Sequence, residues 1–481
     1  MVHAPRRAVN LHAARFADLP RRRVVHRFIL VSLAVAVAAV STIALPAAGR
    51  CQTAPPATTG SPATTEGFLR LEDLERRALE SNPTVAQADA IVRGVLARRR
   101  QAGFYPNPIV GYSAEDITRR EPGRATHSLW LQQTIVTGGK RRHVQAAVAQ
   151  ERIHAEAERD MQRQRVLNAV RMLYYEALGA QRLVEIRRDL ARVAREAVET
   201  SEELFNIGQA DRPDVLEVQI EADRAELEVT RAEHDLARVW QELAAMVGDP
   251  DLPQTPLAGD LEADVPALEE AAVRAEILER SPELRIARAR VEHARASLAR
   301  ARADRIPNFF VRGGAGYNFD RTESGRDVGS EFFVEIGVPL PVFDRNQGNI
   351  GMAEAQLRVA QAEVRRTELA LRTRLAAALR NYRDALRTAE RYRAGILQQA
   401  QQSYELYRDR FAEMAASYPQ VLIARRNLGQ VRADYLRSLI DAWQAAVLLE
   451  GMLLTGGLDA PEAVPGEPPV TVDVVPFTTT P

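Results

Sequence analysis

The chain has 481 residues, of which 46% are hydrophobic and 27% are charged. Such a composition is enough to form a large core, which excludes disorder throughout the chain. Basic and acidic residues each number 64, so no net charge attracts the chain to nucleic acid, and we expect no such partner. The single cysteine, Cys51, excludes an intramolecular disulfide and a thiolate metal cluster.

The amino-terminal segment has the features of a secretory signal. An arginine-rich leader precedes residues 28–45, which are all apolar or small. We therefore expect a signal peptide over residues 1–49 and a flexible segment over residues 50–68. The alternative is an inner-membrane anchor, because the apolar run is nearly long enough to span a bilayer. Cys51 is a candidate for lipidation, although Arg50 stands where lipoprotein signals need a small residue.

The remaining sequence contains an internal duplication. Aligning Pro83 with Pro282 brings the two halves into register without a gap. The aligned pairs are Ala88 with Ala287, Val92 with Val291, Ala97 with Ala296, Ala102 with Ala301, and Pro108 with Pro307. This duplication predicts a first repeat over residues 69–247, a linker over 248–265, a second repeat over 266–457 and a Pro-rich tail over 458–481.

Each repeat contains two segments in which apolar and polar residues alternate, as in a strand with one buried side. The clearest segment is 309–320, followed by 331–338. The residues expected on one face are Phe309, Val311, Gly313, Ala315, Tyr317, Phe319, Phe332, Val334, Ile336 and Val338. The other face then carries Arg312, Gly314, Gly316, Asn318, Asp320, Glu331, Phe333 and Glu335. The first repeat has weaker equivalents around Val110, Tyr112 and Ala114, and around Leu129, Leu131 and Ile135.

These four segments have about the length of a tilted membrane strand, roughly 9 to 11 residues. Alternation alone is equally compatible with a small soluble sheet packed on helices. If the strands lie in a bilayer, four of them cannot close a barrel, so several chains must share one. Residues 118–124 and 321–329 fit the outward hairpin loops. Aromatic residues expected at the membrane interfaces are Tyr105, Trp130, Tyr317 and Phe343.

Very long helices form the rest of each repeat. From Lys140 to Phe205 there is no proline and one internal glycine, Gly179, so a single helix of about 65 residues would reach about 100 Å. A turn over 205–213 leads to a second proline-free run ending at Val247. The second repeat follows the same plan, with a helix over 352–411, a turn over 412–419 and a return to residue 454. Apolar residues at three- and four-residue spacing indicate antiparallel coiled packing.

Two strings identify a family resemblance. The first is Gly208-x-x-x-x-Pro213-Asp214-Val215-Leu216 at the first turn, and its second copy is Pro419-Gln420-Val421-Leu422. Together with the paired prolines and regular alanines, they resemble TolC-type outer-membrane efflux channels over residues 69–457. The second half is also similar to the heavy-metal cation efflux branch of that family.

The resemblance implies a mainly α fold with a small β part. Long helical hairpins would form a periplasmic α-barrel, and four strands per chain would contribute to a transmembrane β-barrel of a homotrimer in outer-membrane lipid. The hairpin tips would meet a periplasmic adaptor protein linked to a proton-driven inner-membrane pump. The implied function is a passive conduit for small solutes, either metal cations or drugs. The alternatives are a periplasmic adaptor or a coiled-coil scaffold of an export complex.

The resemblance also places candidate site residues at the hairpin tips. The adaptor contact falls on Asn206, Ile207, Gly208, Ala412 and Glu413. Glycine at the first tip permits close backbone approach, whereas the second tip has Met414 at the matching place.

The periplasmic entrance of the family is narrowed by carboxylates just after the second tip. This sequence has Gln420 and Ile423 there, and the nearby acidic residues are Asp211, Asp214 and Glu217 of the first tip. The entrance is therefore assigned to these five residues. A solvated helix end would explain the three carboxylates equally well.

Catalytic motifs are absent from the sequence. Gly138-Gly139-Lys140-Arg141 lacks the spacing and the Ser or Thr of a phosphate-binding loop. The histidines show no paired spacing of metal ligands. We expect no enzymatic activity, no cofactor and no resident metal.

Overall fold

The computed structural model describes residues 68–117, 125–263, 265–321, 325–413, 415 and 418–462. The expected signal peptide and flexible segment, Cys51, the loop over 118–124, Met414 and most of the Pro-rich tail lie outside these residues. Among the helices that are described, none combines the length and the apolar composition needed to cross a bilayer.

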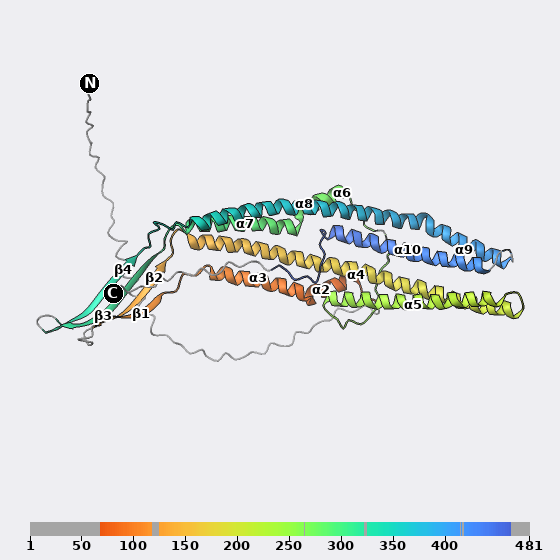
Figure 1. Cartoon of the computed structure of the whole chain (residues 1–481), viewed down its shortest axis with the longest axis horizontal. Coiled ribbons are helices and arrows are strands. Elements are labelled where there is room, and N and C mark those ends of the chain that lie inside the picture. The colour runs from red at the N-terminus through yellow and green to blue at the C-terminus, as the bar shows by residue number, and fades with distance from the viewer. Residues whose placement is uncertain are drawn as a thin grey trace, which may run out of the picture. The chain divides into compact units, whose positions relative to one another are not determined.

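One order of elements occurs twice (Figure 1). The first copy is α2 (Leu71–Ser81), α3 (Pro83–Gln101), β1 (Ile109–Glu115), β2 (Thr126–Ile135), α4 (Lys140–Asn206) and α5 (Arg212–Val247). The second is α6 (Glu270–Arg280), α7 (Pro282–Ala303), β3 (Phe309–Arg321), β4 (Asp327–Gly337), α8 (Gln347–Arg391), η1 (Tyr392–Ile396), α9 (Leu397–Ala412) and α10 (Tyr418–Glu450). The expected mainly α fold with a small β part is confirmed.

The aligned prolines mark the start of equivalent helices. Pro83 and Pro282 occupy the first turns of α3 and α7, where proline loses no helical hydrogen bond. The residue before Pro83 is Asn82, whose side chain accepts a hydrogen bond from the Thr84 backbone N–H at 2.9 Å. Each repeat therefore opens with two short helices rather than one.

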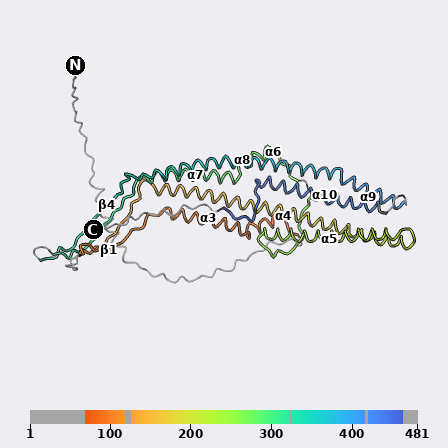
Figure 2. The backbone as a smooth tube through the Cα atoms, in the orientation of Figure 1, coloured from red at the N-terminus to blue at the C-terminus, as the bar shows by residue number. Residues whose placement is uncertain are grey.

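The helix α4 has 67 residues and packs along α5 to form the first hairpin (Figure 2). At 1.5 Å per residue its length is about 100 Å. The strands lie at the end where α4 and α8 begin, and the carboxyl ends of α4 and α9 lie at the other end (Figure 1). The long helices thus separate the sheet from the hairpin tips.

The helix expected over 352–411 is interrupted by a π turn, Tyr392–Ile396. Tyr392 and Leu397 are five residues apart, yet both pack against the same buried cluster. A regular α-helix would turn one of them away from the core, so the wider turn keeps the apolar register. Sequence periodicity did not indicate this irregularity.

The largest core lies where the linker packs between the repeats. Leu252, Leu257 and Leu261 of the linker are buried in it. The indole N–H groups of Trp240 and Trp443 donate to the carbonyls of Leu252 and Leu261 at 3.0 and 3.1 Å. One tryptophan comes from each repeat, so the linker is attached to both.

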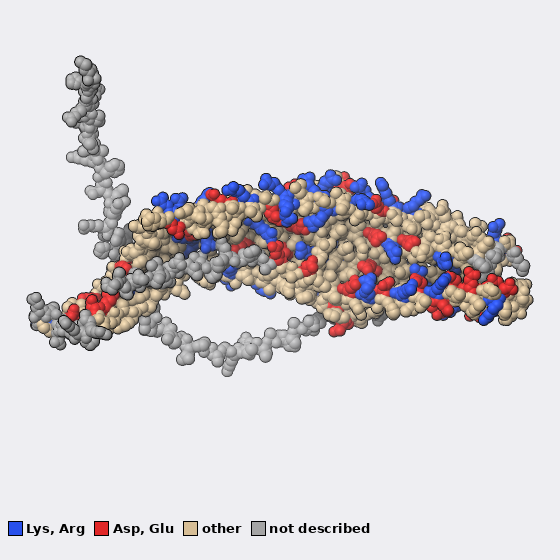
Figure 3. Space-filling model, in the orientation of Figure 1, with Lys and Arg blue, Asp and Glu red and all other residues tan. Residues whose placement is uncertain are grey.

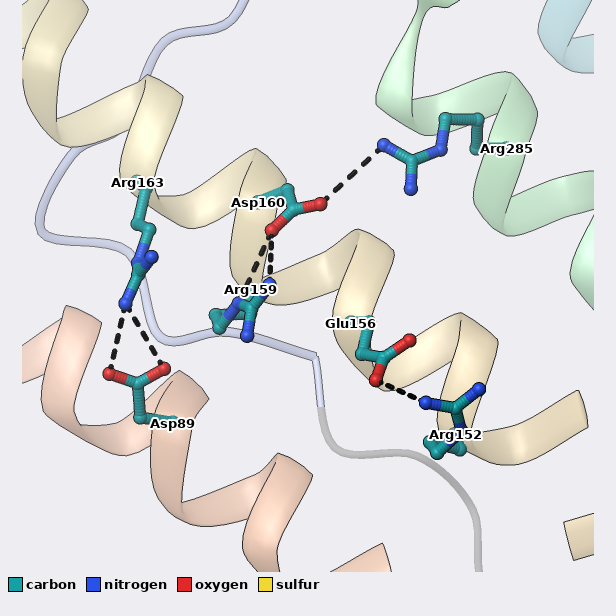
Figure 4. Close-up of polar contacts among 7 residues, drawn as sticks. All are labelled: Asp89, Arg152, Glu156, Arg159, Asp160, Arg163 and Arg285. Atoms are coloured by element: carbon teal, nitrogen blue, oxygen red, sulfur yellow. Dashed lines mark hydrogen bonds and ion pairs between the residues drawn. The ribbon is translucent and has the colours of Figure 1, made fainter. Parts of the chain in front are cut away.

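Ion pairs on the surface of α4 reach α3 and α7 (Figure 4). Arg163 pairs with Asp89 of α3 at 3.3 Å, and Asp160 pairs with Arg285 of α7 at 3.6 Å. Arg159 makes a shorter contact with Asp160, at 2.8 Å. Each partly exposed pair contributes at most about 1 kcal/mol, so these contacts set the register of the helices more than their stability.

Buried polar side chains of α4 hold the chain that follows α10, residues 451–462, which we call the strap. The Asn168 amide donates to the carbonyls of Gly451 and Leu454 at 2.8 and 2.9 Å, and the Gln162 amide donates to that of Gly457 at 3.0 Å. Both amide side chains are fully buried. The strap therefore fixes the end of the second repeat to the first.

Candidate channel wall and periplasmic tips

The four strands form one antiparallel sheet in the order β1-β2-β3-β4. Val110 pairs with Leu131, which lies beside Gly313 and then Val334. The next row along the same face is Tyr112, Leu129, Ala315 and Phe332. We call this side the apolar face. The exposed fractions of Val110, Phe332 and Val334 are 74, 83 and 76%, so a single chain leaves this face uncovered.

The opposite side, which we call the polar face, is acidic. Within the regularly paired strand residues it carries Glu115, Glu331 and Glu335 against one guanidinium, that of Arg312. Arg312 pairs with Glu335 at 3.6 Å, and the Asn318 amide donates to Glu331 at 3.0 Å. Acidic side chains are visible on the strand region in Figure 3.

Aromatic side chains lie near both ends of the sheet. At the loop end, Tyr317 packs against Phe319 with ring centroids 4.6 Å apart. At the helical end, Tyr105 and Phe343 are exposed. Such positions suit aromatic belts at the two interfaces of a membrane. The expectation for Trp130 is wrong, because Trp130 lies in the middle of β2 on the polar face.

The first hairpin tip brings together Asn206, Ile207 and Gly208. Asn206 is the last residue of α4, and Ile207 is 67% exposed. Gly208 has φ +77°, which permits the tight turn, and a Cβ added there would meet no atom within 4 Å. A shallow groove of about 430 Å³ beside the turn is lined by Thr200, Glu203, Leu204, Asn206 and Ile207.

The carboxylates predicted for the entrance lie on the first turns of α5. The Asp211 backbone N–H donates to the carboxylate of Asp214 at 3.2 Å, and the two residues form a capping box in which Asp211 is the N-cap of α5 and Asp214 lies in its first turn. Asp211 and Glu217 are also exposed. The helix-end interpretation therefore accounts for Asp214.

At the second tip, Ala412 ends α9 and Glu413 follows in the turn, both exposed. On α10, Gln420 is exposed and Ile423 is 64% exposed. Further along α10, Arg426 pairs with Glu221 of α5 at 3.8 Å, which links the two hairpins near their tips. The predicted residues thus form two groups, one at each tip.

Metal ligands do not gather in the part of the chain that the structure describes: it contains no group of three or more His, Cys, Asp or Glu side chains placed to hold an ion. The described residues instead form a sheet with one uncovered apolar face, held at one end of two long hairpins.

A profile described as "Outer membrane efflux protein" matches residues 74–249 and 273–453. The chain belongs to the outer membrane efflux protein family.

Individual proteins agree with this family assignment. The cobalt-zinc-cadmium resistance protein CzcC of Cupriavidus metallidurans is 27% identical over 387 residues, covering 80% of this chain and 90% of CzcC. Among solved structures, VceC of Vibrio cholerae is 20% identical with a TM-score of 0.64, covering 80% of this chain and 96% of VceC. CusC is 18% identical with a TM-score of 0.67, covering 83% of this chain and 96% of CusC.

Membership decides between the alternatives left by the sequence. The protein is an outer-membrane channel of a tripartite efflux system with a large periplasmic helical part, and not a periplasmic adaptor or a coiled-coil scaffold. The alternating segments are membrane strands rather than a soluble sheet packed on helices. Outer-membrane strands turn apolar residues to lipid and polar residues to the lumen, so the polar face lines the channel.

Two features were missed by sequence reasoning. One is the row of buried polar residues on α4 that holds the strap, because spacing alone cannot distinguish a buried amide from an exposed one. The other is the packing of aromatic rings on the polar face, which depends on the pairing of distant strands. The alternation in β4 already placed Phe333 on that face, and this was the only available signal.

Proposed function

We propose that this chain acts without enzymatic chemistry, as one subunit of a homotrimer whose twelve strands close a single barrel. The supporting observation is the sheet, in which β1 and β4 are paired on one side only among the described residues. An unpaired strand edge in hydrocarbon leaves backbone N–H and C=O groups without partners, each at a cost of several kcal/mol. Neighbouring copies supply those partners, β4 of one chain to β1 of the next.

Extraction and mass measurement test this proposal. The mature protein is expected to leave membranes only with detergent and to have the mass of three chains. Reconstituted into a planar bilayer, it is expected to conduct ions. A protein that is freely water-soluble as a monomer, with β1 to β4 accessible to aqueous probes, would refute the proposal.

We place the adaptor contact at the tips, on Asn206, Ile207, Gly208, Ala412 and Glu413. The exposed side chain of Ile207 beside an open glycine turn gives an apolar contact with room for close backbone approach. The substitution Ile207→Asp is expected to abolish efflux and to abolish crosslinking of the channel to the adaptor. The variant should still assemble into trimers like the wild type. Leu227→Asp is the control, because Leu227 is also exposed but lies further along α5. Equal loss in both variants would contradict the assignment.

The pump is proposed to be an inner-membrane transporter driven by protons, with metal cations as the cargo. Two observations support cations over apolar drugs: the relative CzcC is named for cobalt, zinc and cadmium resistance, and three glutamates face one arginine on the polar face. Since like charge is repelled from a lumen of low dielectric walls, an acidic wall favours cations.

Deletion of the gene tests the cargo directly. Loss of tolerance to zinc, cobalt or copper with unchanged tolerance to hydrophobic drugs is expected, and the reverse pattern would refute metal cargo. The substitution Glu331→Gln should lower the preference for cations over anions that is measured on the purified channel in a planar bilayer.

The periplasmic entrance is proposed to be formed by Asp211, Asp214, Glu217, Gln420 and Ile423. Because Asp214 belongs to the capping box of α5, the informative substitution is Glu217→Gln, which is expected to lower cation preference without changing stability. Ile423→Asp would add a carboxylate to the second tip and is expected to raise the preference of the channel for cations. Unchanged selectivity in both variants would place the entrance elsewhere.

A further inference from the structure

Aromatic rings on the polar face lie over glycines of the neighbouring strand, in the space that a glycine Cβ would occupy. Trp130 is paired with Gly111, and a Cβ added to Gly111 would overlap three ring atoms of Trp130. Phe310 is likewise paired with Gly337, whose added Cβ would overlap the Phe310 ring. Each ring therefore occupies the space directly above the glycine backbone.

The same arrangement occurs between β3 and β4. Phe333 is paired with Gly314, and a Cβ there would stand 2.6 Å from the Phe333 ring. One level of the sheet consequently reads Gly111, Trp130, Gly314, Phe333 from β1 to β4. Large and absent side chains alternate across the wall.

Arg312 lies on the polar face of β3, two residues before Gly314, and its guanidinium approaches two of these rings. Its guanidinium carbon is 4.1 Å from the centre of the Trp130 ring and 5.8 Å from that of Phe333. Glu335 pairs with the guanidinium at 3.6 Å. The cation–π contact with Trp130 holds the indole against the backbone instead of letting it turn into the lumen.

The bore of a β-barrel depends on how far its inner side chains project. In a barrel of about eight strands the inner side chains fill the lumen, whereas a barrel of about sixteen to eighteen strands keeps a water-filled channel. Twelve strands lie between these limits, so rings projecting from the wall at one level would narrow the channel strongly. Rings lying on glycine add little to the thickness of the wall.

We propose that Gly111, Gly314 and Gly337 set the bore of the barrel by letting Trp130, Phe333 and Phe310 lie flush with the wall. This inference rests on the proposed trimeric barrel. It makes the three glycines determinants of the size of solute that passes, although none carries a side chain that contacts the solute.

Single-channel conductance in planar bilayers tests the inference. Gly111→Ala and Gly337→Ala are the informative variants, because the atoms nearest to their added Cβ all belong to an aromatic side chain and none to the backbone. The control is Gly313→Ala on the apolar face of β3, where the nearest atom is the Phe333 carbonyl oxygen at 3.8 Å. We expect lower conductance in the first two variants and wild-type conductance in the control, with all three trimeric.

A double substitution separates narrowing from misfolding. If Gly111→Ala acts by lifting the Trp130 ring into the lumen, then Gly111→Ala with Trp130→Ala should conduct at least as well as the wild type. Conductance that stays low in the double variant, or is normal in both single variants, would overturn the inference. A wild-type protein that forms no channel at all would instead refute the proposed function.

Discussion

His154 is a buried imidazole on α4 that should make the folded protein sensitive to acid. Burial, together with the positive charges of Arg290 and His293, lowers its pKa from 6.5 to about 4. The carboxylates of Glu462 and Glu151 act in the opposite direction but do not offset the burial. The folded protein therefore holds this ring in its neutral form.

The sign of the pH dependence follows from this lowered pKa. When the pH falls below 6.5 the unfolded chain binds a proton at His154 and the folded chain does not, so stability is lost between pH 6.5 and 4. At pH 5 the unfolded state gains about 2 kcal/mol relative to pH 8 from this group. Below pH 4 both states are protonated and the loss reaches its limit of about 3 kcal/mol.

The perturbation is His154→Gln, which removes the titration and keeps a polar side chain. Chemical denaturation of the detergent-solubilised protein at pH 8 and pH 5 should show that the wild type loses about 2 kcal/mol more than the variant. Glu158, whose pKa burial raises, contributes to both proteins and cancels in the comparison. His234→Gln is the control, because His234 is exposed on α5. Equal pH dependence in wild type and His154→Gln would refute the reasoning.

Three further substitutions test the helical packing through the denaturation midpoint. Gly179→Ala should destabilise by about 1 to 3 kcal/mol, because the added Cβ would overlap the side chain of Ile440 of α10; an unchanged midpoint would contradict this packing. Gly94→Ala should instead stabilise by about 0.5 to 1 kcal/mol, since nothing lies within 4 Å of an added Cβ; a loss would show an unseen neighbour. Asn168→Ala should cost about 1 to 3 kcal/mol by leaving two strap carbonyls without their donor, and chymotrypsin should then cut the strap faster after its buried Leu453 and Leu454.

The long helices were predictable because their signal is redundant. Proline is missing from Lys140 to Asn206, and the residues that break or cap helices stand at the ends. The strands were predictable for a related reason. The alternation of apolar and polar residues can be recognised even where one residue breaks it, as Phe333 does by placing an apolar side chain on the polar face. The internal duplication then strengthened both predictions, because the same order of helices and strands had to fit both halves of the chain.

The irregular features were not predictable because they depend on contacts between distant segments. The π turn at Tyr392–Ile396 compensates for the packing of Tyr392 and Leu397 against residues from other helices. The split into α2 and α3 occurs at Pro83, a residue visible in the sequence, but proline within the first turn of a helix is equally compatible with one helix starting later.

The candidate tip residues illustrate a second limit. Gly208 was informative because a turn with positive φ favours glycine, and φ there is +77°. Asp211 and Asp214 were ambiguous because a carboxylate at the start of a helix is favourable with or without a solute nearby. Geometry resolves the pair as a capping box at the start of α5, since Asp214 accepts the backbone N–H of the N-cap residue Asp211. Charge in a sequence thus locates a helix end more readily than a pore.

Oligomerisation and bore depend on different levels of information. Alternation tells which residues face lipid, and an open sheet edge in lipid requires a neighbour, so the need for several chains follows from sequence and elementary hydrogen-bond chemistry. The width of the lumen does not follow, because Gly111 and Trp130 oppose each other only through the register of β1 and β2. A register shifted by one residue would place Trp130 on the apolar face and leave Gly111 uncovered.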